Sequence, residues 1–109
     1  MDRDNPIGVF DSGIGGLTVL QRLMDALPGE NTVYLGDMAR ASYGAKSAET
    51  VLRYSLENSE FLIEKGVKVV VVACNTSTAI ALGHLRERLS VPVRRKGRVG
   101  GAHRAVKSP

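Results

Sequence analysis

The sequence predicts an α/β fold built on a doubly wound, mostly parallel sheet. Short apolar runs alternate along the chain with segments whose apolar residues recur at helical spacing. The run Val69–Val72 is β-branched throughout, which is typical of a strand buried on both faces of a parallel sheet. No hairpin turn signal joins one apolar run to the next. These three observations favour strands that are connected by crossover helices within one domain.

The first half of the chain predicts a strand, a helix, a second strand and a loop. Residues 7–10 form a short apolar run that predicts the first strand, and a glycine-rich turn follows it. Apolar residues then recur at helical spacing over 17–27, until Pro28 and Gly29 end the pattern. Residues 32–35 predict the second strand, and residues 38–46 predict a loop.

The second half predicts two helices and two strands. Ser47 is a candidate N-cap of a helix that ends at Gly66. The inner face of this helix is expected to be apolar, with Val51, Leu52, Leu56, Leu62 and Ile63. The chain then continues with a third strand, a third helix and the start of a fourth strand, over 67–73, 76–89 and 91–93.

Composition favours a soluble protein of a reducing compartment. A chain of 109 residues with 43% hydrophobic residues is large enough for one small core. Its single cysteine cannot form an internal disulfide. The longest apolar run, residues 69–74, is far shorter than the roughly 20 residues of a membrane span, and residues 1–6 lack the apolar core of a signal peptide. We therefore expect a cytoplasmic location.

Charge divides the chain into an acidic body and a basic tail. Residues 94–109 hold six basic side chains and no acid, whereas residues 1–93 hold nine basic and eleven acidic side chains. We expect residues 1–93 to form the domain and residues 94–109 to be a basic, irregular tail. Such a tail is usually a solvated terminus, and a phosphate-binding arm is the alternative.

Three chemically active residues follow the carboxyl ends of predicted strands, where α/β sheets bind ligands. They are Asp11, Asp37 and Cys74. A thiol at the start of a helix has a lowered pKa because the helix dipole stabilises the thiolate. Asn75 and Thr76 are able to cap the same helix and to hold a carboxylate. A structural thiol that ends an apolar strand is an equally good interpretation of Cys74.

The remaining motifs are weaker. The segment Asp11–Gly16 is glycine-rich, but it matches neither the P-loop nor the dinucleotide-binding pattern, so a tight turn is favoured over an anion site. The chain has no Cys-x-x-Cys pair, and His84 and His103 have no metal-ligand spacing. We predict no metal site.

Three segments together resemble the amino-terminal half of glutamate racemases, in the aspartate/glutamate racemase superfamily. They are Ile7–Leu17, Tyr34–Gly44 with Asp37 and Arg40 inside it, and Val72–Thr76. In this order and spacing the resemblance is strong, and it covers about residues 6–93. It implies a racemase domain that interconverts L- and D-glutamate by two-base proton transfer for peptidoglycan biosynthesis.

The resemblance also implies roles for individual residues. Cys74 corresponds to the first catalytic cysteine, which exchanges the α-proton of one enantiomer, and Asp11 to the acid that assists it. The implied substrate-binding residues are Asp11, Ser12, Tyr43, Gly44, Asn75 and Thr76. The family uses no metal, pyridoxal phosphate or nucleotide, so no cofactor is implied. The implied partner is a small-molecule substrate, glutamate. No membrane association is expected, and nucleic acid is not favoured as a partner. Formation of a homo-oligomer is left as an alternative.

The chain departs from the family in two respects. Racemases of this family are about twice as long, and their second half brings another cysteine to face the first, whereas this sequence holds Cys74 alone. After Val93 the sequence changes to the basic tail. We therefore expect a truncated or frame-disrupted racemase domain that is inactive by itself. The alternatives are a racemase of aspartate or another acidic amino acid, and a non-catalytic binding fragment.

Overall fold

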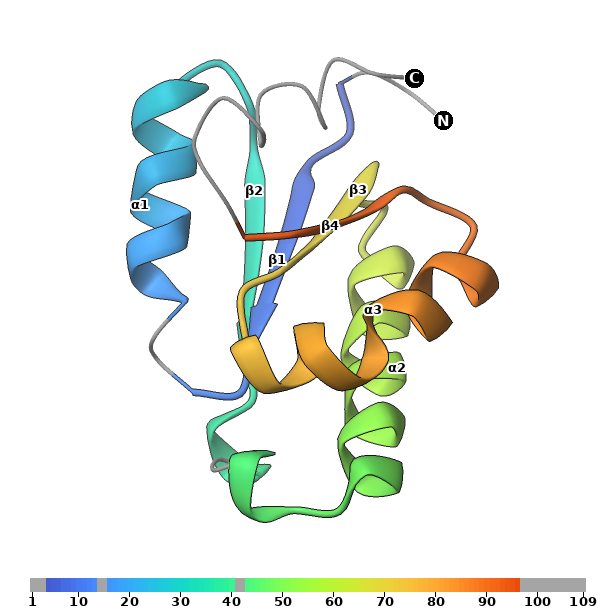
Figure 1. Ribbon diagram of the computed structural model, residues 1–109. Coiled ribbons are helices and arrows are strands. Elements are labelled where there is room, and N and C mark those ends of the chain that lie inside the picture. Colours follow the sequence, from blue (N-terminus) through green and yellow to red (C-terminus); the bar gives the residue numbers. More distant parts are fainter. Residues whose placement is uncertain (1–3, 14–15, 41–42, 97–109) are drawn as a thin grey trace.

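The computed structural model describes residues 4–13, 16–40 and 43–96, and it shows one parallel sheet of four strands (Figure 1). The strands are β1 (Ile7–Asp11), β2 (Thr32–Gly36), β3 (Val69–Val72) and β4 (Val93–Arg95). Their order across the sheet is β2-β1-β3-β4. Every residue of the two central strands is buried, which explains the continuous apolar character of both runs.

Helices cover both faces of the sheet, so the doubly wound α/β prediction is confirmed. The first helix, α1 (Leu17–Ala26), lies on one face and buries Leu23 against the odd-numbered residues of β1 and β3. Helices α2 (Ala48–Glu64) and α3 (Asn75–Arg88) lie together on the other face (Figure 1). There they cover Phe10 and the even-numbered residues of β3.

The strand order places a topological switch point between β1 and β3. From β1 the chain crosses to β2 on one side, and it later returns to β3 on the other side. Phe10 pairs with Val72 at the carboxyl ends of these two strands. The residues that follow, Ser12 and Cys74, are therefore brought to the same edge, where ligands bind in sheets of this kind.

The helix signals are confirmed at both ends of α2. The Ser47 hydroxyl accepts a hydrogen bond from the Thr50 backbone N–H at 3.2 Å, as an N-cap does. Gly66 has a φ of 83°, the left-handed conformation that commonly ends a helix. The inner face of α2, however, is not purely apolar: Ser55, Asn58 and Ser59 are buried between Val51 and Leu62.

Two other segments differ from expectation. The predicted loop contains two short 3₁₀ helices, η1 (Met38–Arg40) and η2 (Tyr43–Ala45). Strand β4 continues through Arg95, and the Lys96 N–H donates to the Val72 carbonyl at 3.0 Å. The strand expected to begin at residues 91–93 thus starts at Val93 and continues beside β3 through Arg95. Of the basic tail expected over residues 94–109, residues 97–109 lie outside the described residues.

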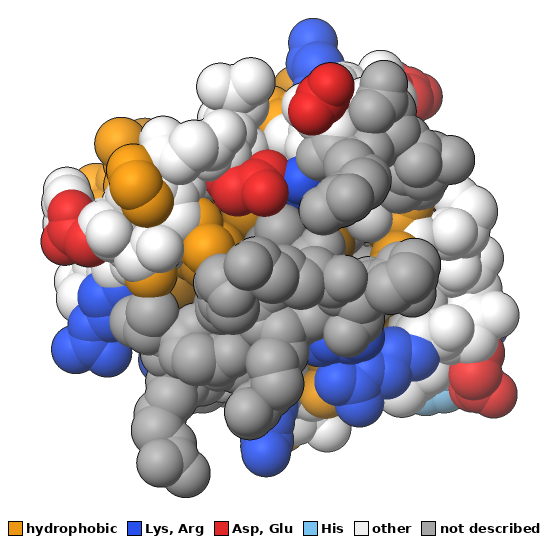
Figure 2. Space-filling model, turned by 90° about the horizontal axis from the view of Figure 1, so that it is seen from above, with side chains coloured by type: hydrophobic (Ala, Val, Ile, Leu, Met, Phe, Trp, Pro, Cys, Tyr) orange, Lys and Arg blue, Asp and Glu red, His pale blue; other side chains and the backbone are white. Residues whose placement is uncertain are grey.

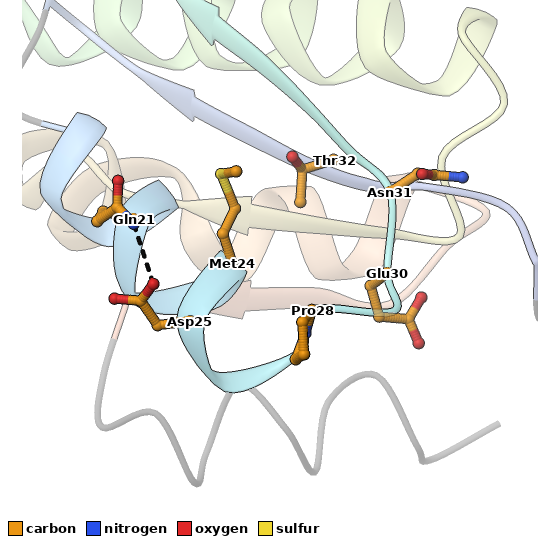
Figure 3. Close-up of a pocket in the computed structure, with 7 residues that line it drawn as sticks. All are labelled: Gln21, Met24, Asp25, Pro28, Glu30, Asn31 and Thr32. Atoms are coloured by element: carbon orange, nitrogen blue, oxygen red, sulfur yellow. Dashed lines mark hydrogen bonds between the residues drawn. The ribbon is translucent and has the colours of Figure 1, made fainter.

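Figure 2 views the molecule from the side of the amino-terminal strand ends, and the described part of this face shows acidic, basic and hydrophobic side chains. The Lys68 ammonium pairs with Glu30 there. A hollow between the end of α1 and the start of β2 is lined by Gln21, Met24, Asp25, Pro28, Glu30, Asn31 and Thr32 (Figure 3). In the described part of the chain, no helix is long and apolar enough to span a membrane.

Candidate active site

Cys74 lies at the junction of β3 and α3, where it is the N-cap residue of the helix. Its Sγ accepts a hydrogen bond from the Ser77 backbone N–H at 3.5 Å. The Ser12 hydroxyl, from the loop after β1, lies 3.5 Å from the same sulfur. The thiol is buried and packs against Tyr43 and Val51. Cys74 therefore caps α3 and contacts Ser12 after the end of β1, in addition to packing in the core.

These contacts favour the ionised form of the thiol. Burial raises the pKa of Cys74, but hydrogen bonds from Ser12, from the backbone and hydroxyl of Ser77, and from the Thr76 backbone outweigh it. The net effect lowers the pKa of the thiol below its ordinary value. The α3 residues of the first turn carry no acid that would oppose this. These hydrogen bonds therefore stabilise the thiolate form of Cys74.

Asp11 is buried at the end of β1, but its carboxylate points toward α1. Its Oδ2 accepts a hydrogen bond from the Gly16 backbone N–H at 2.6 Å. The same carboxylate raises the pKa of Tyr34, after burial of that phenol, whose hydroxyl donates to the Gly13 carbonyl at 2.8 Å. The Asp11 carboxylate thus connects the end of β1 to the residue before α1, and Ser12, the next residue in the chain, contacts the thiol.

The loop over η2 brings Gly44 to the amino end of α3. A Cβ atom at Gly44 would lie 3.8 Å from the Thr76 hydroxyl oxygen, so the exposed Gly44 backbone faces the first turn of the helix. Asn75 is exposed and Thr76 is half-buried at this turn. Ser12, Gly44, Asn75 and Thr76 therefore surround the edge at which Cys74 lies.

Tyr43 lies beneath this edge rather than in it. Its side chain is 1% exposed. Its hydroxyl donates to the Asp37 carboxylate and accepts from the Asn58 amide at 2.8 Å. Burial, followed by the bond to Asp37, raises the pKa of this phenol, so it stays neutral. Tyr43 therefore anchors η2 from the interior through Asp37 and Asn58, while the next residue, Gly44, lies at the surface.

A polar network fastens this loop to α2, and sequence reasoning missed most of it. Arg40 binds the Asp37 carboxylate at 2.9 Å, the Asn58 amide oxygen at 3.2 Å and the Glu57 carboxylate. Its guanidinium also lies 3.9 Å from the centre of the Tyr54 ring. The missed signal is a polar residue, Asn58, at a helical position where the apolar stripe of α2 predicts a hydrophobic one.

The described residues hold no group of three or more histidine, cysteine or acidic side chains that is arranged to bind a metal. His84 is exposed on α3, and His103 lies outside the described residues.

Gly16 is expected to be essential to the packing of the Ser12 loop. A Cβ atom there would lie 2.8 Å from the Asp11 Cβ and 3.0 Å from the Tyr34 ring. Gly16→Ala should lower the free energy of unfolding by about 1–3 kcal/mol, since backbone or ring must move. Gly13→Ala, in the same loop, meets no described atom within 4 Å and should cost under about 0.5 kcal/mol. Urea denaturation of both variants tests this, and equal losses would contradict it.

The chain is similar to glutamate racemases in sequence. No protein-family model matches it. It is 59% identical over 87 residues to a glutamate racemase of Geobacter metallireducens, an alignment that covers 80% of this chain and 32% of that protein. The chain thus spans about a third of the length of such curated relatives.

Solved structures show the same similarity in three dimensions. The crystal structure of glutamate racemase from Thermus thermophilus, in complex with β-chloro-D-alanine, superimposes with a TM-score of 0.84 and 53% identity over 87% of this chain and 37% of that one. The enzyme from Francisella tularensis, in complex with D-glutamate, gives 0.81 and 45% over 86% and 36%. In both sequence and fold, therefore, this chain is similar to about one third of a glutamate racemase.

Proposed function

We propose that the chain forms the part of a glutamate racemase that carries one of its two proton-transfer groups, Cys74. The observation that carries this proposal is the thiol at the start of α3, whose hydrogen bonds lower its pKa at the switch point of the sheet. A base of this kind removes the α-proton of an amino acid or returns one to it. No cofactor is required for this step.

Glutamate is the proposed substrate because the similar proteins are named glutamate racemases, and one of them was solved with D-glutamate. A racemase of aspartate or of another acidic amino acid is not favoured by these similarities. The amino end of α3 offers backbone N–H groups and a positive dipole to a carboxylate. Ser12, Asn75, Thr76 and the Gly44 backbone surround this point and are proposed to bind the substrate.

Asp11 is proposed to assist deprotonation through its effect on Ser12 rather than by direct contact with the thiol. Its carboxylate holds the Gly16 N–H, and this fixes the turn that places the Ser12 hydroxyl beside Cys74. Tyr43 is proposed to act in the same indirect manner, since its anchored hydroxyl fixes the position of Gly44. Both residues would thus position substrate-binding groups without contacting the substrate themselves.

Inversion of an α-carbon requires two groups, because the proton leaves one face and another proton arrives at the opposite face. The 109 residues supply one cysteine, so the opposite group is proposed to come from the remaining two thirds that similar racemases have. In that enzyme the reaction would supply D-glutamate for peptidoglycan, and hence for cell-wall biogenesis and cell shape, in the cytoplasm.

The test compares the purified 109-residue chain with a chimera in which the chain replaces its counterpart in a glutamate racemase. We expect the chimera to convert L-glutamate to D-glutamate and the chain alone to give no turnover, measured by circular dichroism of the amino acid. Turnover by the chain alone, lost in Cys74→Ala, would contradict the two-group proposal. A chimera that accepts aspartate better than glutamate would contradict the proposed substrate.

A further inference from the structure

Strand β2 and the residue after it bind both chain neighbours of Ser12. The backbone carbonyl of Asp11, the residue before it, accepts a hydrogen bond from the Asp37 N–H at 2.9 Å. The backbone carbonyl of Gly13, the residue after it, accepts a hydrogen bond from the Tyr34 hydroxyl at 2.8 Å. Ser12 is therefore held on one side by a backbone N–H and on the other side by a tyrosine side chain.

The Tyr34 ring lies between two glycines. Tyr34 pairs with Val9 in the parallel register and packs on the sheet face that α1 covers. A Cβ atom at Gly16 would lie 3.0 Å from one edge of the ring, and a Cβ atom at Gly36 would lie 3.2 Å from the other edge. The Cβ atom at Gly36 would also lie 2.7 Å from the Gly13 carbonyl oxygen. The two glycines therefore leave room for the phenol and for the carbonyl that it binds.

Ser12 in turn contacts the thiol at the end of the neighbouring strand. Its hydroxyl oxygen lies 3.5 Å from the Cys74 sulfur. A serine hydroxyl is able to accept a hydrogen bond from a neutral thiol and to donate one to a thiolate. Ser12 and Cys74 follow different strands, so their contact depends on where the backbone of Ser12 is held.

We propose that Tyr34 is a positioning residue, whose hydroxyl keeps Ser12 in contact with the Cys74 thiol. It acts through the Gly13 carbonyl. Burial, followed by the Asp11 carboxylate, raises the pKa of this phenol, so the hydroxyl keeps its proton while the thiol titrates. The hydrogen bond from Ser12 helps to lower the pKa of Cys74, so loss of the Tyr34 hydroxyl should raise it. The catalytic meaning of this contact rests on the proposed function, whereas its effect on the thiol does not.

The other titratable and charged groups on the elements around the thiol are left in place when the Tyr34 hydroxyl is removed. They are Asp11 at the end of β1, Asp37 and Arg40 around η1, Tyr43 in η2, Tyr54 in α2, and Arg95 and Lys96 at the end of β4. The first turn of α3 carries no acid. The Asp11 carboxylate accepts from the Gly16 N–H, and the Asp37 carboxylate is bound by Arg40 and Tyr43. The Tyr34 hydroxyl takes part in none of these described contacts.

The test is the pH dependence of thiol alkylation by iodoacetamide in the full 109-residue chain. Because the sequence has one cysteine, the reaction reports on Cys74 alone. Ser12→Ala should raise the pH midpoint, so that the thiolate fraction below the midpoint falls roughly threefold to tenfold. Tyr34→Phe keeps the ring and removes the hydroxyl. It should reduce the same fraction roughly twofold to fivefold, because Ser12 remains but is held less firmly.

A double variant and a matched control make the test specific. In the Ser12→Ala background, Tyr34→Phe should cause no further shift, because it acts through Ser12. Tyr54→Phe makes the same chemical change on α2, in a ring that packs against the cluster containing Cys74. It should leave the midpoint unchanged, because this ring contacts the Arg40 guanidinium through its face, which the substitution retains.

An unchanged midpoint in Tyr34→Phe or in Ser12→Ala would overturn the proposal. A further shift from Tyr34→Phe in the Ser12→Ala background would overturn it as well, because the tyrosine would then act on the thiol by another route. An equal shift in Tyr54→Phe would do the same, since it would show a general effect of lost phenol hydroxyls. The assay uses no glutamate, so absence of racemase activity would refute the proposed function and leave this result standing.

Discussion

Replacing Cys74 by alanine in the chimeric racemase should abolish interconversion of L- and D-glutamate, with a loss in kcat of at least about 10³-fold. A positioned acid or base typically contributes 10²–10⁴-fold, and here the lost group acts on one face of the substrate in both directions. The alanine side chain keeps the backbone of the α3 start but removes the sulfur that Ser12 and Ser77 contact. Circular dichroism of the amino acid measures the rate from each enantiomer.

Two features of the result would separate a catalytic role from a structural one. Because Cys74 is buried, its replacement also removes packing, so the melting temperature of each variant is measured alongside the rate. Ser59→Ala serves as the control, since it removes a buried group on α2 without contact with the thiol. Retention of more than about a tenth of the activity in a folded Cys74→Ala protein would contradict the role of the thiol.

Asn58→Leu should destabilise the chain by about 1–3 kcal/mol, because it removes one hydrogen-bond partner from the buried Tyr43 hydroxyl and one from Arg40. The Asn58 amide donates to Tyr43 and its oxygen accepts from Arg40. Leucine fills a similar volume but satisfies neither group. Glu57→Ala removes an exposed contact of the same Arg40 and should cost under about 1 kcal/mol. Urea denaturation of both variants gives the comparison, and similar losses would refute a buried network.

The same substitution has an expected kinetic consequence in the chimera. Tyr43 fixes the η2 loop, so loss of its Asn58 contact should let Gly44 move away from Thr76. We expect the Michaelis constant for glutamate to rise more than kcat falls, because the loop is proposed to bind substrate rather than to transfer protons. A fall in kcat alone would assign the network to a different step.

The order of elements could be predicted because buried strands appear as apolar runs and half-buried helices as apolar residues at helical spacing. The continuous β-branched run before Cys74 became a central strand, and Ser47 and Gly66 mark the ends of α2 as capping chemistry predicts. Strand ends that share one edge predicted that Asp11, Asp37 and Cys74 would lie close together, and in the structure the residue after Asp11, Ser12, is the one that contacts Cys74.

The direction of the Asp11 side chain was not predicted, although the sequence holds its signal. Alternation along β1 places Asp11 on the same face as Ile7 and Val9, which is the face that α1 covers. Ser12 and Cys74 belong to the opposite set. Position at a strand end therefore indicates closeness to the site, while the two-residue period decides which neighbours a side chain meets.

The polar contacts of α2 could not be derived from the pattern alone. Ser55 and Asn58 interrupt an apolar stripe, and such an interruption shows that buried partners exist without saying which they are. Those partners, Ser77 and Tyr43, are 22 and 15 residues away and are brought near by the crossing of α2 with α3 and η2. Tertiary structure alone identifies them.

The most direct test of the account follows the α-proton itself. The chimera is incubated with one glutamate enantiomer in D₂O, and ¹H NMR monitors the Cα position of substrate and product at early times. We expect deuterium in the product enantiomer and protium in the remaining substrate. In Cys74→Ala we expect no inversion of the enantiomer whose proton this thiol removes, and hence no deuterated product. Undiminished inversion in Cys74→Ala would contradict the assignment of Cys74 as a proton-transfer group.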